Sequence, residues 1–357
     1  MDVLAEIIGI RYSPFLCREL NVFNFDHLEN ALSKSGSFIL NVGTKDQIAV
    51  SWWVSAKRTR SYPYARVYDT LGSQWKKVTI IPLVKDEGKE GDRDFLQWDT
   101  VSLMSLLGVY TIISYYDDAE QSSRYEQKIT NQRFDMSHLR GEIFNLLSYQ
   151  SDALHWNLAQ IEKVGEIGQR ALDSYENISK KLGVEMHSKE SAKKRVDELL
   201  KGKEIFMRLS RDLAKKAQDR ESITVQPKER LFGIKANLTI KNYLGGYYFF
   251  TCDEVTVEKK TIYLVEGKHS KQGLIPSLED IKDGLIKMIL FTNLRGVKIR
   301  DTEYSPIPGL KLTSDTKFSR ELLKGSQIDH LRLLKKEAKE NSFKVLINDT
   351  DLQEINL

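Results

Sequence analysis

The chain has 357 residues, of which 41% are hydrophobic and 29% charged, so it can hold two domains, or one domain with a large insertion, and can bury a core. No stretch reaches the roughly 20 apolar residues of a membrane span, and the N-terminus carries acids where a secretory signal carries lysines, so neither a membrane segment nor a targeting segment is expected. The formal net charge of +4 is compatible with a polyanionic partner but is too small to establish one.

Residues 1–130 are predicted to form an N-terminal α/β module. Runs of β-branched and aromatic residues predict strands at Phe38–Val42, Ile48–Val54, Val78–Val84 and Val109–Tyr116. A helix is expected at Thr100–Leu107, before the last of these strands. The module therefore has the order of a small α/β layer, and a role in DNA recognition is expected for it.

A stretch rich in tyrosine and arginine, KRTRSYPYARVYDT, lies inside this module. With a period of two, Tyr62–Asp69 continues as a strand with four side chains on one face: Tyr62, Tyr64, Arg66 and Tyr68. Such a face offers stacking surfaces to unpaired bases and hydrogen bonds to phosphate. The residues expected to contact nucleic acid are Lys57, Arg58, Arg60, Tyr62, Tyr64 and Arg66. The alternative is an edge strand, which Pro63 suits, with its tyrosines on a small core and its arginines paired with Asp69, Asp86 or Glu87.

Residues 131–225 are predicted to be a helical hairpin or bundle. Apolar residues recur at helical spacing from about Met136 to Leu182, and Ser191–Ala217 continues as a basic helix. This region is either a scaffold or dimerisation arm, or a positively charged helix that lies along a phosphate backbone.

Residues 226–357 are predicted to form an α/β core of the order β-β-β-α-β-α-β. The first three strands are expected at Leu231–Ile240, Tyr247–Val257 and Thr261–Lys268. An amphipathic helix follows in PSLEDIKDGLIKMILFTN, with Ser277 as its cap. The remaining elements are expected at Val297–Arg300 (strand), Gln327–Glu340 (helix) and Phe343–Ile347 (strand).

The hairpin made by the second and third of these strands carries charged residues among apolar ones. By strand alternation, Glu266 and Lys268 share the face of Ile262 and Leu264, and the turn between the strands brings Asp253 level with Glu266. Mg²⁺ binds through one or two carboxylates together with water and substrate phosphates. An ammonium group beside the metal can orient or help deprotonate the attacking water.

The pattern Asp253…Glu266-Gly267-Lys268 resembles the PD-(D/E)xK nuclease superfamily, which includes many restriction endonucleases. In that family the acid and the ExK motif lie on adjacent strands of a central sheet, and a helix and another strand follow. The resemblance spans about Arg230–Ile347 and implies a restriction-endonuclease-like core, a mixed sheet flanked by helices. It implies Asp253, Glu266 and the Gly267 carbonyl as ligands of Mg²⁺, with Mn²⁺ as a substitute, and Asp253, Glu266 and Lys268 as catalytic residues.

This chain departs from the family pattern at one position, and for a second position of the pattern it offers two candidates. Cys252 stands where the motif has proline. The family often has a further acid on a preceding helix, for which Glu142 and Glu229 are both candidates. The alternative to a metal site is a solvated strand end that carries a Glu–Lys pair.

Together these features predict a Mg²⁺-dependent endonuclease that hydrolyses DNA with water directly, as part of a restriction or other defence system. The alternatives are a DNA-repair nuclease and a non-catalytic DNA-binding or scaffold protein that retains the fold. No GxxxxGK[ST] motif is present, so no nucleotide cofactor is expected, and double-strand cleavage favours a homodimer. Two widely spaced cysteines, Cys17 and Cys252, favour a reducing cytoplasm.

Overall fold

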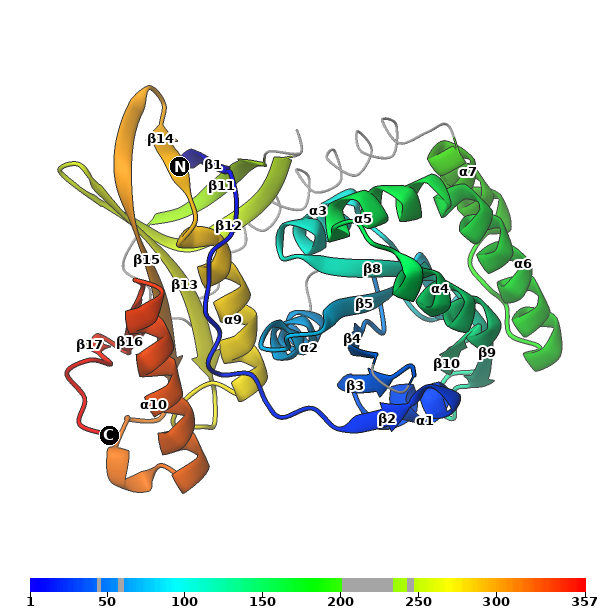
Figure 1. Cartoon of the computed structure of the whole chain (residues 1–357), viewed down its shortest axis with the longest axis horizontal. Coiled ribbons are helices and arrows are strands. Elements are labelled where there is room, and N and C mark those ends of the chain that lie inside the picture. Colours follow the sequence, from blue (N-terminus) through cyan, green and yellow to red (C-terminus); the bar gives the residue numbers. More distant parts are fainter. Residues whose placement is uncertain (44–45, 57–60, 201–233, 243–246) are drawn as a thin grey trace. The chain divides into compact units, whose positions relative to one another are not determined.

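The structure is a computed structural model that describes the chain except for residues 44–45, 57–60, 201–233 and 243–246 (Figure 1). Its contacts define two compact units. Unit 1 comprises Met1–Glu19, Tyr64–Gly72 and Arg211–Leu357, and unit 2 comprises Leu20–Pro63 and Ser73–Ser210. The sequence analysis divides the chain at residues 130 and 225 into continuous domains. This division remains a prediction about which stretches of the chain fold independently. In the described part of the chain, no helix is long and apolar enough to cross a membrane.

Unit 1 contains a large mixed sheet flanked by helices (Figure 1). The strands are paired in the order β13-β12-β11-β1-β14-β15-β16-β17, and β13 also pairs with β15, so the pairing closes on itself. The bounds are β1 Asp2–Ile7, β11 Ile234–Asn242, β12 Tyr247–Glu258, β13 Thr261–Ser270, β14 Arg295–Ile299, β15 Thr302–Ser314, β16 Lys344–Ile347 and β17 Thr350–Asp351. The strands predicted for this part of the chain are thereby confirmed.

The two helices predicted for the C-terminal part are present, and the strands around them are partly antiparallel and partly parallel. β11, β12 and β13 are antiparallel neighbours, whereas β13, β15 and β16 run parallel. The parallel steps are bridged by α9 (Leu278–Phe291) and α10 (Gly325–Glu340), and η2 (Arg320–Leu322) precedes α10. Ser277 caps α9 as predicted, because its hydroxyl accepts a hydrogen bond from the backbone N–H of Asp280 at 3.1 Å.

The sequence analysis missed β1 and β15. β15 holds Pro306 and Pro308, which argue against a central strand because proline donates no ladder hydrogen bond. The N–H of Ser305 points to β13, where it donates to Lys260 O at 2.8 Å, so the two proline nitrogens face the other edge. On that edge β14 pairs only as far as Tyr304 and β16 begins at Gly309. The prolines therefore occupy the one interval where no N–H is needed.

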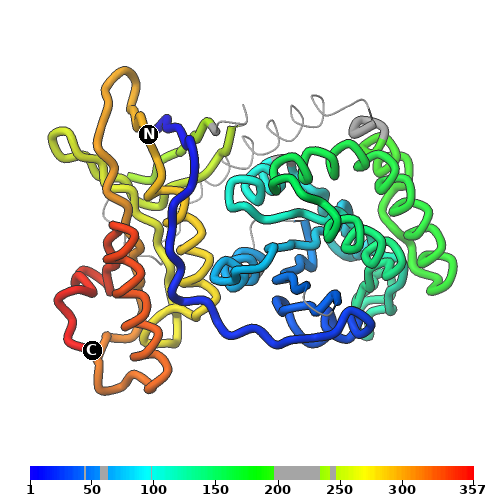
Figure 2. Tube along the Cα trace, viewed as in Figure 1, coloured from blue at the N-terminus to red at the C-terminus, as the bar shows by residue number. Residues whose placement is uncertain are grey.

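A buried carboxylate ties three distant parts of unit 1 together. Glu337 of α10 is 0% exposed and accepts hydrogen bonds from the hydroxyls of Tyr12 (2.7 Å) and Tyr68 (2.6 Å) and from the backbone N–H groups of Phe15 (2.8 Å) and Leu16 (3.0 Å). Burial raises the pKa of Glu337 despite these donors. The N-terminal segment and α10 are thus joined around one side chain, and β1 continues that segment beside β11, as the trace in Figure 2 shows.

Unit 2 is a separate α/β layer with a sheet of order β2-β3-β4-β5-β8. The strands of this sheet are β2 Val22–Asn24, β3 Ser37–Asn41, β4 Gln47–Trp52, β5 Lys76–Pro82 and β8 Val109–Ser114. Two further pairs of strands form separate two-stranded ribbons. They are β6 Val84–Asp86 with β7 Arg93–Phe95, and β9 Tyr116–Gln121 with β10 Ile129–Phe134. Its helices are η1 Phe25–His27, α1 Leu28–Lys34, α3 Trp98–Leu106, α4 Met136–Ser148, α5 Ala153–Glu162, α6 Val164–Leu182 and α7 Lys189–Leu200. The four strands and the helices predicted here are confirmed, but α1 and the short strands β2, β6, β7, β9 and β10 were missed. The basic helix expected up to Ala217 is described only as far as Leu200.

The edge strand β8 is covered by side chains of α5. Asn157 accepts from the N–H of Thr111 at 2.6 Å and donates to Val109 O at 3.0 Å, and Gln160 accepts from the N–H of Ile113 at 3.1 Å. Amide side chains one helical turn apart thus replace a neighbouring strand and protect an edge that would otherwise be open to pairing.

The segment predicted as the strand Tyr62–Asp69 is instead the helix α2 (Ser61–Leu71), so that prediction is wrong. The buried side chains of Tyr64, Val67 and Tyr68 recur at helical spacing, and the same tyrosines also fit a period of two. Pro63 lies in the first turn, where a helix tolerates proline. Tyr64 is 7% exposed and Tyr68 is 0% exposed, so neither offers a stacking surface to a base.

Candidate active site

The paired strands β12 and β13 place Asp253 level with Glu266. Their pairing runs from Glu258 opposite Thr261 to Glu254 opposite Val265, and Asp253 and Glu266 are the next residues on the two strands. Here the N–H of Gly267 donates to Asp253 Oδ2 at 2.9 Å instead of to a backbone carbonyl. A carboxyl group therefore takes the place of a ladder acceptor, and the two acidic side chains come together at this point.

Glu266 is a buried anion with two cationic partners. It is 2% exposed, and its Oε1 lies 2.9 Å from Lys268 Nζ while its Oε2 lies 2.7 Å from Lys287 Nζ. Burial alone would raise the pKa of Glu266, but the charges of Lys287 and Lys268 and hydrogen bonds with Lys287 and Asp253 outweigh it and lower that pKa to about 2. The alternative of a solvated strand end is thus wrong, because this Glu–Lys pair lies inside the fold.

Lys268 is held between two carboxylates. Besides Glu266, its ammonium group contacts Asp283 Oδ2 of α9 at 2.5 Å. Burial would lower the pKa of Lys268, but Glu266 and Asp283 outweigh it and raise that pKa well above its ordinary value. Lys268 therefore acts as a fixed positive charge in this arrangement, and a role as general base is not supported.

The Asp253 and Glu266 carboxyl groups are in hydrogen-bonding contact, which contributes to the low pKa of Glu266. Two carboxylates this close repel each other unless cations lie beside them, and the ammonium groups of Lys268 and Lys287 are such cations. The carboxylate oxygens are hard ligands of the kind that Mg²⁺ binds. Among the residues that the structure describes, no group of three or more His, Cys, Asp or Glu side chains could hold a metal.

Sequence reasoning missed two members of this cluster, Asp283 and Lys287. Both lie on α9, four residues apart and hence on one side of the helix. The available signal was that α9 carries apolar residues on several sides, which is typical of a buried helix, so its charged residues had to lie inside the protein. Gly284 lets this helix approach the sheet, since a Cβ there would lie 2.6 Å from Leu310 Cδ1 and 3.4 Å from Lys268 Cε.

Of the remaining predicted residues, those that the structure describes lie outside this cluster. Lys57, Arg58, Arg60 and Glu229 lie outside the described residues, as does the side chain of Tyr62. Tyr64 is buried and Arg66 is half-buried on α2. Glu142 belongs to unit 2, where it pairs with Lys163 at 2.9 Å and also contacts Gln160. Cys252, in the place of the motif's proline, is buried, and its Sγ contacts Val265 O at 3.3 Å.

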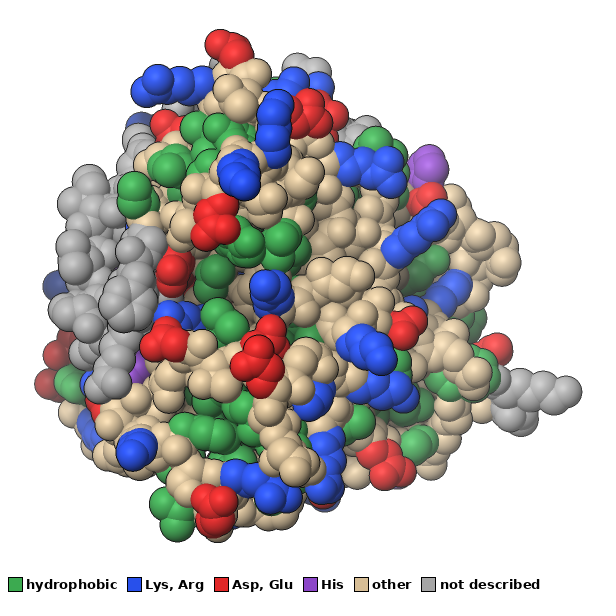
Figure 3. Space-filling view, turned by 90° about the vertical axis from the view of Figure 1, so that its left-hand side faces the viewer, with side chains coloured by type: hydrophobic (Ala, Val, Ile, Leu, Met, Phe, Trp, Pro, Cys, Tyr) green, Lys and Arg blue, Asp and Glu red, His purple; other side chains and the backbone are tan. Residues whose placement is uncertain are grey.

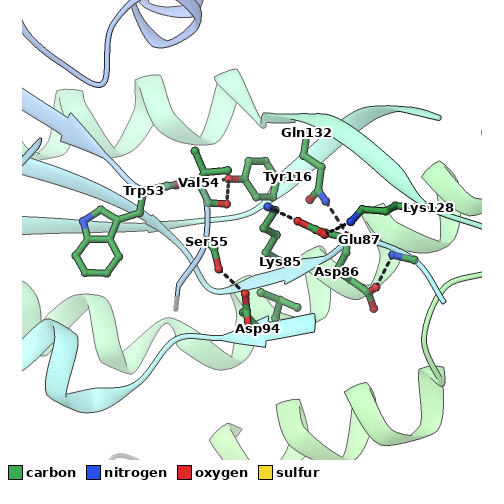
Figure 4. A network of polar contacts seen from close by, with 12 residues as sticks. Trp53, Val54, Ser55, Lys85, Asp86, Glu87, Asp94, Tyr116, Lys128 and Gln132 are labelled. Atoms are coloured by element: carbon green, nitrogen blue, oxygen red, sulfur yellow. Dashed lines mark hydrogen bonds and ion pairs between the residues drawn. The ribbon is translucent and has the colours of Figure 1, made fainter. Parts of the chain in front are cut away.

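Unit 2 holds a second polar network, along the β6–β7 ribbon (Figure 4). Glu87 binds Lys85 at 2.6 Å and Lys128 at 2.9 Å, and the hydroxyl of Ser55 donates to Asp94 at 2.6 Å. On the other side of the ribbon, Asp86 contacts His187 at 2.7 Å. These pairs tie the ribbon to neighbouring segments, which is a structural role.

Asp69 is the last of the three acids considered as partners for the arginines of the tyrosine- and arginine-rich stretch. It binds Arg18 at 3.1 Å and also Lys282 of α9. On the face shown in Figure 3, lysine and arginine side chains are interspersed with aspartate and glutamate, so the side chains drawn there do not gather into one basic patch. Charge on this face therefore does not mark a nucleic-acid surface.

Comparison with protein-family models, with curated proteins and with solved structures finds no match to this chain. The evidence for a function therefore comes from the geometry of the cluster.

Proposed function

We propose that unit 1 carries the active site of a Mg²⁺-dependent nuclease of the PD-(D/E)xK type, with a restriction-endonuclease-like core. The observation that carries the proposal is that the Asp253 carboxyl group binds the N–H of Gly267, next to Glu266 on the adjacent strand, and that Lys268, two residues further along β13, pairs with Glu266. The order of elements supports it, since the acid and the ExK motif lie on adjacent strands, α9 follows, and β15 pairs with β13.

Each residue has a distinct task in this proposal. Asp253, Glu266 and the carbonyl of Gly267 would hold the metal ion, which supplies an acidified water molecule and neutralises charge that develops on phosphorus. Lys268 stays charged and stabilises negative charge near the reacting phosphate. Its contact with Asp283 holds the ammonium group in one position, so little reorganisation is needed during the reaction.

DNA as the substrate, a place in a restriction or other defence system, Mn²⁺ as a substitute metal and a homodimer are parts of the same proposal. The resemblance to the nuclease family supports them, and the tyrosines of α2 do not contribute. A DNA-repair nuclease would share the same chemistry. A second candidate, a non-catalytic DNA-binding or scaffold protein, is favoured by one observation, namely that both oxygens of Glu266 are already paired with lysines.

The test is cleavage of plasmid and single-stranded DNA by the full chain, with Mg²⁺, with Mn²⁺ and with a chelator. Wild type should cleave only with metal. Asp253→Asn and Glu266→Gln keep the side-chain shape but remove a charged ligand, so metal affinity and cleavage should fall at least about 100-fold. Lys268→Met should lose cleavage to a similar extent and keep metal binding.

A matched control is Glu258→Gln, an exposed carboxyl group at the end of β12 next to the hairpin turn. It should cleave like wild type. Metal-independent cleavage, or full activity in Glu266→Gln, would refute the nuclease site. DNA binding without any cleavage in wild type would favour the non-catalytic alternative.

A further inference from the structure

The helix α9 contributes a pair of opposite charges that completes an alternating row. Asp283 binds Lys268, Lys268 binds Glu266, and Glu266 binds Lys287. Lys287 also donates to the backbone carbonyl of Thr251 at 3.3 Å. All of these groups belong to unit 1, and Lys287 retains 20% exposure of its side chain while Glu266 retains 2%.

The formal charges of this cluster suit a particular ligand. The carboxylates of Asp253, Glu266 and Asp283 outnumber the ammonium groups of Lys268 and Lys287 by one. If one divalent cation binds to them, the cluster carries one excess positive charge. A phosphodiester, which has one negative charge, restores neutrality. A phosphate monoester dianion would instead leave one excess negative charge.

The two lysines are not equivalent once a metal ion binds to Glu266. Lys268 keeps its second carboxylate, Asp283. Both carboxylates that act on Lys287, those of Glu266 and Asp253, would then be ligands of the metal, and its other contact described here is the carbonyl of Thr251. Its ammonium group is then the cation that most needs an anionic partner, beside the metal and at the more exposed end of the row.

We propose that Lys287 is a phosphate-binding residue of this site, and that the cluster is matched to one divalent cation and one phosphodiester group. This inference rests on the proposed nuclease function and adds the residue that binds the substrate and the charge of the substrate group. It assigns Lys268 and Lys287 to different tasks, since the first is fixed by Asp283 and the second turns to the phosphate.

The experiment compares Lys287→Met, Lys287→Arg and Lys282→Met with wild type in two assays. The first is the kcat and KM of DNA cleavage with Mg²⁺. The second is DNA affinity over a range of salt concentrations with Ca²⁺, a probe that takes the same oxygen ligands. Lys282→Met is the matched control, because Lys282 is a buried lysine of α9 that pairs with Asp69, away from the cluster.

Lys287→Met should weaken DNA binding on the order of tenfold, and should lower the salt slope by about one because one phosphate contact is lost. Its metal affinity should stay the same or rise, because a neighbouring positive charge has been removed. Lys287→Arg should restore the salt slope. Lys282→Met should lower the melting temperature and leave the KM and the salt slope unchanged.

An unchanged salt slope and KM in Lys287→Met would overturn the inference, as would a loss of metal affinity, which would show that Lys287 only supports Glu266. A wild-type chain that does not cleave would refute the nuclease function. If that chain still bound DNA in a metal-dependent way, and this binding required Lys287, the assignment of Lys287 as a phosphate-binding residue would hold even though no cleavage occurs.

Discussion

At the scale of single residues, Glu266 shows why a charged position in a strand can be misjudged. In the sequence, its separation from Lys268 by one residue is typical of an exposed ion pair. Such a pair contributes about 0–1 kcal/mol to the free energy of unfolding. In the structure the pair is buried, and breaking such a pair from one side costs about 3–5 kcal/mol because an uncompensated charge remains. Alanine at either position is therefore expected to destabilise unit 1, and isosteric variants are the better probes of chemistry.

Glu87 of unit 2 gives a prediction about pH. Burial raises its pKa, but the hydrogen bonds and charges of Lys85 and Lys128 outweigh it and lower that pKa to about 2. Since the folded pKa lies below the unfolded value of about 4.3, the stabilisation is complete above that value and is lost as the pH falls towards 2. Calorimetric melting should show wild type more stable than Glu87→Gln at about pH 6, with a difference that shrinks as the pH approaches the folded pKa. Parallel curves for the two proteins would contradict this.

At the scale of elements, α9 gives a prediction about packing. Alanine in place of a helical glycine usually stabilises a helix by about 1 kcal/mol. At Gly284 the new methyl group would meet Leu310 Cδ1 at 2.6 Å, and overpacking costs about 1–3 kcal/mol. Gly284→Ala should therefore fail to stabilise unit 1 and should lower its melting temperature.

The control for this prediction is another helical glycine. A Cβ added at Gly141 of α4 would have no neighbouring atom within 4 Å, so Gly141→Ala should raise stability by about 1 kcal/mol. Combining Gly284→Ala with Leu310→Val should recover part of the loss, with a coupling energy of about 0.5–3 kcal/mol. A Gly284→Ala variant as stabilised as Gly141→Ala would mean that α9 lies farther from β15 than described.

The elements that the sequence predicts well are those whose hydrophobic period is unambiguous. β12, β13 and α9 follow from alternation, a turn and a cap, and with them the approach of Asp253 to Glu266. α2 was mistaken for a strand because Tyr62, Tyr64, Arg66 and Tyr68 satisfy a period of two. Asp283 and Lys287 were missed because a helix pattern shows which side is apolar but not which charged side chain meets which strand.

At the scale of the whole molecule, unit 1 depends on residues from both ends of the chain. β1 pairs with β11 along Asp2–Ile7 and with β14 on its other side, so it lies inside the sheet. Tyr12, Phe15 and Leu16 also supply donors to Glu337. No local pattern reveals such a pairing, because its partners are more than 200 residues apart. For that reason the sequence indicated continuous domains.

This arrangement predicts that residues 226–357 do not fold alone. Without β1 the sheet is opened between β11 and β14, and without Tyr12 and Tyr68 the buried carboxylate of Glu337 loses donors, at about 1–3 kcal/mol or more for each unsatisfied group. Residues 226–357 alone, and the chain without residues 1–19, should lack the cooperative calorimetric transition of unit 1 that the full chain shows. A cooperative transition in the isolated segment would support the sequential division instead.

The pairing of β1 with β11 also affects how the protein is made. A ribosome adds about 5–20 residues per second, so β1 waits on the order of ten to fifty seconds before its partner β11 is synthesised. During that time Val3, Ala5 and Ile7, which are buried in the finished sheet, have no strand to cover them. Unit 1 can close only after α10 has emerged with Glu337. The cluster of Asp253, Glu266 and Lys268 thus reaches its folded surroundings only after α10 has been synthesised, long after β1 and well after the three residues of the cluster themselves.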